Sequence, residues 1–241
     1  GSSLDYETAS SYNLNIVSSD DGGLTYSQDF TIALSDVNDR PVITSDSAGA
    51  TANVSVAENQ TLVTTVLAED EDAGDGSTGT ALSYTVDTSG GVDHTLFSLG
   101  AASGVLSFIT APDFEVMTDG DTDGVYQVTV VVSDDEGLTD SQLISVTVSD
   151  VNEAPTDIVL SSNLIDEDAV DATVVGTLSS TDQDSSDTHS YTLSDDSGLF
   201  EIVGHKLQLK TGSSLDYETT PTYVVQMVSK DSGDLSFSQD F

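Results

Sequence analysis

Pairs of carboxylates recur through this chain at short, regular spacings, and they are the residues best suited to chemistry. The pairs follow the patterns Asp-x-Glu and Asp-x-Asp. In an extended segment, residues two apart point to the same side, so both carboxylates of a pair can reach one ion. Oxygen donors without accompanying His or Cys suit Ca²⁺, which takes roughly six to eight oxygens. The pairs are Asp5/Glu7, Asp70/Asp72, Asp113/Glu115, Asp182/Asp184 and Asp216/Glu218.

The acidic pairs belong to an internal repeat. The segment 1–8 (GSSLDYET) returns unchanged at 212–219, and 27–30 (SQDF) returns at 238–241. A third Asp-x-Glu pair, at 113–115, lies between the two identical copies. Self-similarity of this kind is the signature of a repeat architecture. Because a catalytic site occurs once whereas these acids recur at each copy, we predict a structural device and not an enzyme.

Alternating apolar and polar residues follow each Asp-x-Glu pair. They occupy 12–16 (YNLNI), 126–130 (YQVTV) and 223–227 (YVVQM). A period of two rich in Val, Ile and Tyr predicts β-strands, and no segment has helical spacing. Several short strands separated by turn residues favour an all-β fold of tandem Greek-key β-sandwich domains.

Two similar segments mark the ends of repeats. They are 36–41 (DVNDRP) and 150–155 (DVNEAP), and each closes with a proline, which ends a strand. We therefore predict the C-terminal part of one repeat, a complete repeat, and a repeat truncated before its last strand. The first part has too few strands to bury a core, so we expect it to be poorly packed or to borrow strands from another copy. The predicted boundaries are 1–41, 42–155 and 156–241.

The composition narrows the range of partners. The chain has 4 basic and 43 acidic residues, which gives a formal net charge of −39. This balance excludes ordinary nucleic-acid binding, which needs Lys and Arg, and a polybasic membrane anchor. The absence of Cys excludes disulfides and thiolate zinc sites. No apolar run approaches about 18 residues, so we expect no direct membrane insertion in this segment.

The order of the acidic motifs resembles tandem cadherin repeats. Members of that family carry x-E-N, D-x-D, L-D-x-E, an Asp after the sixth strand and a D-x-N-D-N-x-P linker, in that order. The complete repeat here gives AEN at 57–59, DED at 70–72, DFE at 113–115, VSD at 132–134 and DVNE at 150–153. The resemblance covers the whole chain, and its Thr-, Ser- and Asp-rich strands look like the cadherin repeats of large bacterial secreted surface adhesins. It implies immunoglobulin-like cadherin domains in an extracellular surface protein, joined by short calcium-binding linkers.

The resemblance also implies which residues bind calcium between successive domains. At the first linker they are Asp5, Glu7, Asp36, Asn38, Asp39, Asp70, Asp72 and Asp134. At the second linker they are Glu58, Asp113, Glu115, Asp150, Asn152, Glu153, Asp182, Asp184 and Asp231. Glu167, Asp216 and Glu218 would serve a third linker.

Several positions depart from the family pattern or have a simpler interpretation. Glu153 replaces a linker Asp, and its extra methylene is expected to shift or weaken coordination. The complete repeat carries six extra residues after its Asp-x-Glu pair, within TDGDTDG at 118–124. We interpret that loop as a solvated turn. The alternative is that the loop binds an ion of its own. Asp and Gly usually mark turns, so 72–76 (DAGDG) fits a turn or a calcium site equally well. Isolated histidines, at 94, 189 and 205, are interpreted as bystanders.

The functional expectation is a calcium-binding module for cell adhesion and extension, in which Ca²⁺ makes the junctions rigid. Its partners would be calcium and like modules on other cells, through homophilic adhesion, or a surface polysaccharide. The alternatives are a polysaccharide-binding accessory module or a passive spacer of a secreted multidomain enzyme. Aromatic platforms usually serve sugar stacking, and the lack of Trp weighs against the polysaccharide module.

Overall fold

The computed structural model describes residues 4–73, 81–90, 93–195 and 198–241. Part of the predicted turn at 72–76, namely 74–76, lies outside the described residues, as does 1–3 of the repeated octapeptide. The chain forms two compact units, residues 1–150 and 151–241. The division falls inside the second proline-terminated segment.

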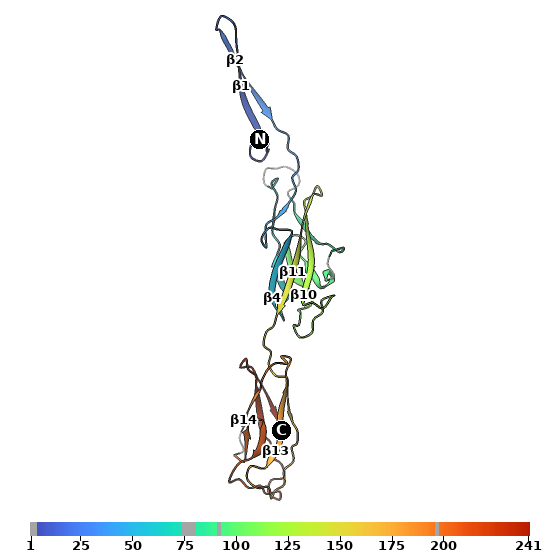
Figure 1. Ribbon diagram of the computed structural model, residues 1–241, viewed down its shortest axis with the longest axis vertical. Coiled ribbons are helices and arrows are strands. Elements are labelled where there is room, and N and C mark those ends of the chain that lie inside the picture. The colour runs from blue at the N-terminus through green and yellow to red at the C-terminus, as the bar shows by residue number, and fades with distance from the viewer. Residues whose placement is uncertain (1–3, 74–80, 91–92, 196–197) are drawn as a thin grey trace. The chain divides into compact units, whose positions relative to one another are not determined.

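The first unit begins with a β-hairpin. Strand β1 (Ser11–Ser19) pairs antiparallel with β2 (Thr25–Ala33), from Ser11 opposite Ala33 to Ser19 opposite Thr25 (Figure 1). The alternation of apolar residues predicted the strands correctly. Every residue of both strands is nevertheless exposed, including Ile16 at 56%. The hairpin therefore has an apolar face that no part of the described chain covers.

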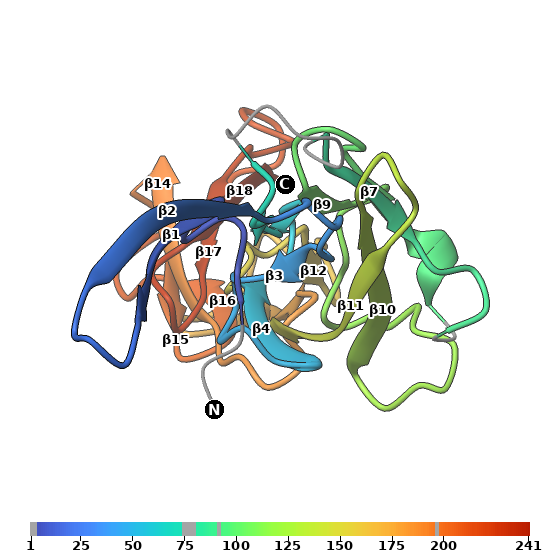
Figure 2. The same ribbon diagram turned by 90° about the horizontal axis from the view of Figure 1, so that it is seen from above.

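The rest of the first unit is a β-sandwich. One sheet has the order β4-β11-β10-β7, in which β4 is parallel to β11 and the other neighbours are antiparallel (Figures 1 and 2). The facing strands form the sheet β5-β9-β8 and the short pair β3-β6. The bounds of the first sheet are β4 Thr51–Ala57, β7 Ser83–Val86, β10 Val125–Ser133 and β11 Thr139–Ser149. The others are β3 Val42–Ile43, β5 Leu62–Thr65, β6 Ala68–Glu69, the 3₁₀ turn η1 His94–Leu96, β8 Phe97–Leu99 and β9 Val105–Phe108.

The core of this sandwich follows from the period-two pattern of β10. Alternate residues of that strand are buried, and Val128 and Val130 are 0% exposed. Across the core, the ring of Phe108 on β9 packs edge-on against Tyr126, with 5.2 Å between ring centroids. Burial of such aromatic and branched side chains is the main favourable contribution to folding. The two sheets therefore share one hydrophobic core.

The second unit repeats the sandwich. Its sheets have the orders β12-β13-β16-β15 and β14-β17-β18; in Figure 2, β17 and β18 lie side by side. Ile158 and Leu209 from the first sheet pack with Met227 from the second, and each is at most 1% exposed. The bounds are β12 Asp157–Leu160, β13 Val174–Thr181, β14 Ser190–Asp195, β15 Phe200–Val203, β16 Lys206–Leu209, β17 Gln226–Lys230 and β18 Ser236–Asp240.

The second unit ends in a short strand. Strand β18 covers Ser236–Asp240 and pairs antiparallel with β17, with Lys230 opposite Ser236. The pairing begins directly after the turn, so the SQD letters are already part of the strand, as the same letters are in β2. That this repeat is truncated before its last strand stays a prediction.

Candidate metal centre

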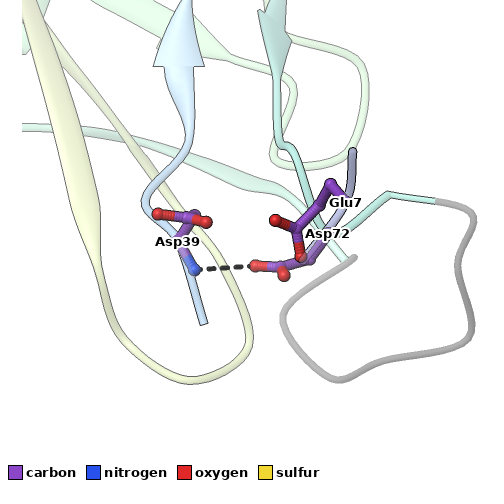
Figure 3. A group of neighbouring side chains, drawn as sticks. All are labelled: Glu7, Asp39 and Asp72. Atoms are coloured by element: carbon purple, nitrogen blue, oxygen red, sulfur yellow. Dashed lines mark hydrogen bonds between the residues drawn. The ribbon is translucent and has the colours of Figure 1, made fainter. Parts of the chain in front are cut away.

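The first linker gathers acids that are distant in the sequence. Carboxylate oxygens of Glu7, Asp39 and Asp72 lie within 4.8 Å of one another (Figure 3). The backbone amide of Asp39 donates a hydrogen bond to Asp72 Oδ2 at 2.8 Å. Glu7 precedes the linker, Asp39 belongs to it, and Asp72 follows β6. One cluster therefore joins three separate segments of the chain.

Asn38 connects the same linker to the loop after β10. Its side-chain Nδ2 donates to Asp134 Oδ2 at 2.9 Å and to the carbonyl of Asp39 at 3.0 Å. Asp134 Oδ1 accepts hydrogen bonds from the backbone amides of residues 136 to 138. Burial raises the pKa of Asp134, but the bonds from Asn38 and from these amides outweigh it, so the pKa lies below its ordinary value of 3.8.

Asp70 is the buried member of the Asp-x-Asp pair. It is 8% exposed, and its Oδ1 accepts a hydrogen bond from the amide of Asp72 at 3.1 Å. Burial is the main reason why the pKa of Asp70 lies above 3.8, and the negative charges of Asp72 and Asp134 raise it further. The hydrogen bond from the Asp72 amide acts in the opposite direction but does not cancel these effects. A cation near Asp70 would offset the cost of burying the charged carboxylate and its repulsion by Asp72 and Asp134.

Buried oxygen atoms at this linker test whether a metal ion fits. Glu7 Oε1, Asp36 Oδ1, Asn38 Oδ1 and Asp70 Oδ2 are buried and have no hydrogen-bond partner among the described residues. A buried polar atom without a partner costs about 1–3 kcal/mol, and more when it is charged. All four are oxygens, which are the donors that Ca²⁺ prefers. The residues present therefore fit a calcium ion.

The charge of Glu7 reflects the same crowding. Its own backbone hydrogen bond lowers the pKa of its carboxyl group. Burial and the charges of Asp36, Asp39 and Asp72 outweigh that bond, so the pKa lies above its ordinary value of 4.5. Groups with pKa values perturbed in this way are common at functional sites.

Asp5 has a different local role from Glu7. Its Oδ1 accepts the amide of Thr8 at 2.8 Å, and its Oδ2 accepts the Thr8 hydroxyl at 2.9 Å. The same arrangement recurs in the second copy of the octapeptide, where Asp216 accepts from the Thr219 amide at 3.1 Å and hydroxyl at 2.9 Å. The first acid of this motif thus shapes a turn. Its predicted role as a ligand would use its remaining lone pairs.

Three ligands predicted for the second linker lie together in the first unit. Carboxylate oxygens of Glu58, Asp113 and Glu115 lie within 4.8 Å of one another. Glu58 is 1% exposed, and its Oε2 accepts the amide of Phe114 at 2.8 Å. In the second unit, Glu167 Oε2 accepts the amide of Tyr217 at 3.0 Å, which is the equivalent contact. The glutamate of the x-E-N motif in the first unit, and Glu167 before Asp168 at the equivalent place in the second, are therefore held against the Asp-x-Glu pairs.

The ligands predicted in the second unit repeat the scaffold of the first linker. Asn152 Nδ2 donates to Asp231 Oδ2 at 3.2 Å and to the carbonyl of Glu153 at 3.2 Å. The amide of Glu153 donates to Asp184 Oδ2 at 2.8 Å, and the amide of Asp184 donates to Asp182 Oδ1 at 3.3 Å. The replacement of Asp by Glu153 leaves the backbone contact unchanged. Asp150, which is exposed, is the last residue of the first unit, and its role as a ligand stays a prediction.

One histidine is misjudged by the sequence interpretation. His189 Nε2 lies 2.8 Å from Asp182 Oδ2, so His189 is not a bystander but contacts a predicted ligand. The turn between the two residues brings them together. Their separation of seven residues in the sequence did not indicate this contact. His205 packs edge-on against Tyr191, with 5.3 Å between ring centroids.

Comparisons with known proteins agree with the fold. Residues 162–239 match the family model of the cadherin domain, and residues 38–147 match that of a bacterial Ig domain. Human protocadherin gamma-A2 is 29% identical over 99% of this chain. The chain spans 25% of that relative. No helix in the described part of the chain is long and apolar enough for a membrane crossing.

Solved structures of cadherin-type extracellular domains match the fold of this chain. The extracellular domain of protocadherin gamma B4 matches 99% of this chain at 25% identity with a TM-score of 0.58, and the chain covers 38% of it. Extracellular cadherin domains 1–4 of protocadherin gamma B7 match 99% at 25% identity with a TM-score of 0.55, and the chain covers 58% of them. The all-β, immunoglobulin-like prediction is confirmed. The chain thus has the fold of the extracellular cadherin domains that it matches, and its residues 162–239 match the family model of the cadherin domain.

Proposed function

We propose that the acids at the linkers bind Ca²⁺ and that bound calcium makes the junctions between repeats rigid. The observation that carries this proposal is the Glu7, Asp39 and Asp72 cluster, because its acids come from before, within and after one linker. Without a cation these carboxylates repel one another. Bound Ca²⁺ would supply the positive charge that allows the three segments to stay together.

The ligands at the first linker would be drawn from two kinds of residue. Glu7, Asp39 and Asp72 would contribute carboxylate oxygens from the cluster, and Asp36, Asn38 and Asp70 would contribute the buried oxygens that have no hydrogen-bond partner. Asp134, which orients Asn38, and Asp5 complete the predicted set. A cluster with this many carboxylates is suited to more than one ion.

We extend the proposal to the second linker because its local contacts are the same. The pairs Asn152/Asp231 and Glu153/Asp184 in the second unit correspond to Asn38/Asp134 and Asp39/Asp72 in the first. Its other ligands would be Glu58, Asp113, Glu115, Asp150 and Asp182. We also propose that the repeats end at residues 41 and 155, as the proline-terminated segments predict.

The proposed biological role is calcium-dependent adhesion or extension at a cell surface, in which the modules bind like modules. The match of residues 38–147 to a bacterial Ig domain favours a bacterial surface protein as the setting. Solved relatives include a cis-dimer of protocadherin gamma B7, which supports contacts between like modules. This role requires no catalytic step.

The test is a calcium titration of the whole chain by calorimetry and thermal unfolding. We expect saturable heat and a melting temperature that rises with calcium, since a ligand at a hundredfold its Kd stabilises by about 2.7 kcal/mol. Asp39→Ala should reduce both, whereas Asp29→Asn on the exposed hairpin strand should not. A melting temperature that calcium leaves unchanged would refute the proposal. Calcium-dependent self-association in ultracentrifugation would support adhesion, and retention on polysaccharide without it would favour the accessory module.

A further inference from the structure

A second acidic cluster lies within the middle repeat, away from the residues predicted for the linkers. The loop before β10 contains Asp119, Asp121 and Asp123, and their carboxylate oxygens lie within 4.8 Å of one another. The sequence 119–124 (DGDTDG) places an acid at every second position and ends with glycine. A solvated turn would present such side chains to water separately, whereas here they converge.

One member of this cluster is buried in a way that a solvated turn does not explain. Asp119 is 4% exposed. Its Oδ2 accepts the amide of Gly124 at 3.0 Å, but its Oδ1 is buried and has no hydrogen-bond partner among the described residues. Burial of a charged oxygen without a partner is expensive. An ion held between the three carboxylates would remove that cost.

Another buried acid, Asp93, holds the loop in place through hydrogen bonds. Asp93 is 1% exposed, and its two oxygens accept the amides of Gly120 at 2.6 Å and Gln127 at 2.8 Å. These bonds hold Gly120, which lies between the first two acids, and Gln127, which follows the third. The backbone turns through Thr122 and Gly124, whose φ angles are 59° and 79°. The acids are therefore held close together by neutral backbone contacts, and their mutual repulsion is not relieved.

The electrostatics of the loop agree with this geometry. Partial loss of hydration raises the pKa of the exposed Asp121 above 3.8, and the charges of Asp123 and Asp119 raise it further. A hydrogen bond from the Asp123 amide acts in the opposite direction without cancelling them. No Lys or Arg occurs between residue 41 and residue 205, so the protein offers no cationic side chain from its own neighbouring sequence.

We infer that the loop 119–124 binds a Ca²⁺ ion of its own, through the carboxylates of Asp119, Asp121 and Asp123. Three alternating acids followed by glycine form the first half of a known calcium loop, Asp-x-Asp-x-Asp-Gly-x₅-Glu. Here the position of the final Glu is Val130, which is 0% exposed in β10. Water or backbone carbonyls would complete the shell. With one carboxylate fewer, we expect an affinity in the range of about 10⁻⁴–10⁻³ M, as in extracellular modules.

The experiment is a calcium titration of the whole ¹⁵N-labelled chain followed by NMR at the amides of Gly120 and Gly124. These amides should shift with saturation below about 10 mM calcium. Asp121→Asn combined with Asp123→Asn removes two exposed charges, so it should spare the fold and abolish the saturable shifts. The amide of Asp39 reports the first linker and should respond in wild type and in this variant alike.

The outcomes separate the two calcium proposals. Absence of saturable shifts at Gly120 and Gly124, or shifts that persist in the double variant, would overturn the loop site and leave the linker proposal standing. Equal or tighter saturation with Mg²⁺ would overturn the assignment to calcium. Asp29→Asn, which removes an exposed charge from the hairpin, is the matched control and should leave both amides responsive.

Discussion

The backbone amide of Asp39 lies 2.8 Å from Asp72 Oδ2, and this single bond ties the linker to the Asp-x-Asp pair that follows it. The equivalent bond in the second unit joins Glu153 to Asp184 at the same distance. Because the bond comes from the backbone, it survives the change of side chain from Asp to Glu. This contact of each linker is thus made by its main chain and does not use the carboxylate of Asp39 or Glu153.

The first prediction concerns Asp70 in the absence of calcium. Its raised pKa means that the folded state binds a proton more tightly than the unfolded state. Its contribution to stability therefore falls as pH rises from 3.8 through the raised pKa. Asp70→Asn keeps the acceptor for the Asp72 amide and removes the charge. In a chelator at pH 7, we expect the variant to melt about 2–4 °C higher than wild type.

Two controls make the Asp70 result specific. Below pH 3.8 the wild-type carboxyl is protonated in both states, so the difference in melting temperature should vanish. In saturating calcium the order should reverse, because the variant has lost a ligand. A variant that is less stable than wild type in chelator at pH 7 would show that Asp70 is not under electrostatic stress.

The second prediction is that acid weakens calcium binding at the first linker earlier than ordinary carboxylates would allow. The pKa values of Glu7 and Asp70 lie above 4.5 and 3.8, respectively, and a protonated carboxyl group is a poor ligand. Below a raised pKa, the calcium affinity should fall about tenfold per pH unit for each competing proton. Calorimetry between pH 7 and pH 4.5 measures this slope. Glu7→Gln should bind more weakly at pH 7 but show a shallower slope.

Sequence alone predicted much of the fold, and the reason is visible in particular residues. Tyr126 and the alternate valines after it define a strand with one buried face, and that face is indeed the core of the first sandwich. The same alternation in β1 predicted the strand but could not predict its burial. Burial depends on the partner strands, and Tyr12 is 38% exposed where its counterpart Tyr126 is 2% exposed.

The sequence predicted those parts of the candidate site in which the spacing of the acidic residues determines which carboxylates meet. The cluster of Glu7, Asp39 and Asp72 follows from three motifs in the expected order. The contact between His189 and Asp182 could not be predicted, because it depends on how a turn folds back. The burial of Asp119 was also hidden, since it results from the unpredicted contacts that Asp93 makes beneath the loop.

The third prediction separates the structural and metal-binding roles of Glu58. Its Oε2 accepts the Phe114 amide, and the residue is 1% exposed. Glu58→Gln keeps an acceptor for that amide, so it should fold normally and lose calcium affinity at the second linker. Glu58→Ala leaves the amide without a partner and should destabilise the unit by about 1–3 kcal/mol in chelator. Urea unfolding and calorimetry measure the two effects. Equal destabilisation by both variants would contradict the separation.

The fourth prediction uses the close approach of Gly233 to the second linker. A Cβ atom at this position would lie 2.2 Å from Asn152 Oδ1, which is too close for any real contact. Gly233→Ala should therefore displace the Asn152 side chain from Asp231 and weaken calcium binding by about tenfold, without touching a carboxylate. The matched control is Gly204→Ala in the turn between β15 and β16 of the same unit, where a Cβ meets nothing within 4 Å although φ is +62°. It carries backbone strain without a clash, so it should cost stability but not calcium affinity.

The fifth prediction is that His189 competes with calcium for Asp182. The imidazole Nε2 lies 2.8 Å from Asp182 Oδ2, so it occupies an oxygen that a calcium ion would need. His189→Ala should raise calcium affinity at the second linker by up to about fivefold, since a contact of this kind contributes at most about 1 kcal/mol. Calorimetry of the variant and the wild type measures the difference. His205→Ala removes a histidine that packs on Tyr191 instead, so its calcium affinity should match wild type. A loss of affinity in His189→Ala would mean that the ring orients Asp182 for the ion and does not compete with it.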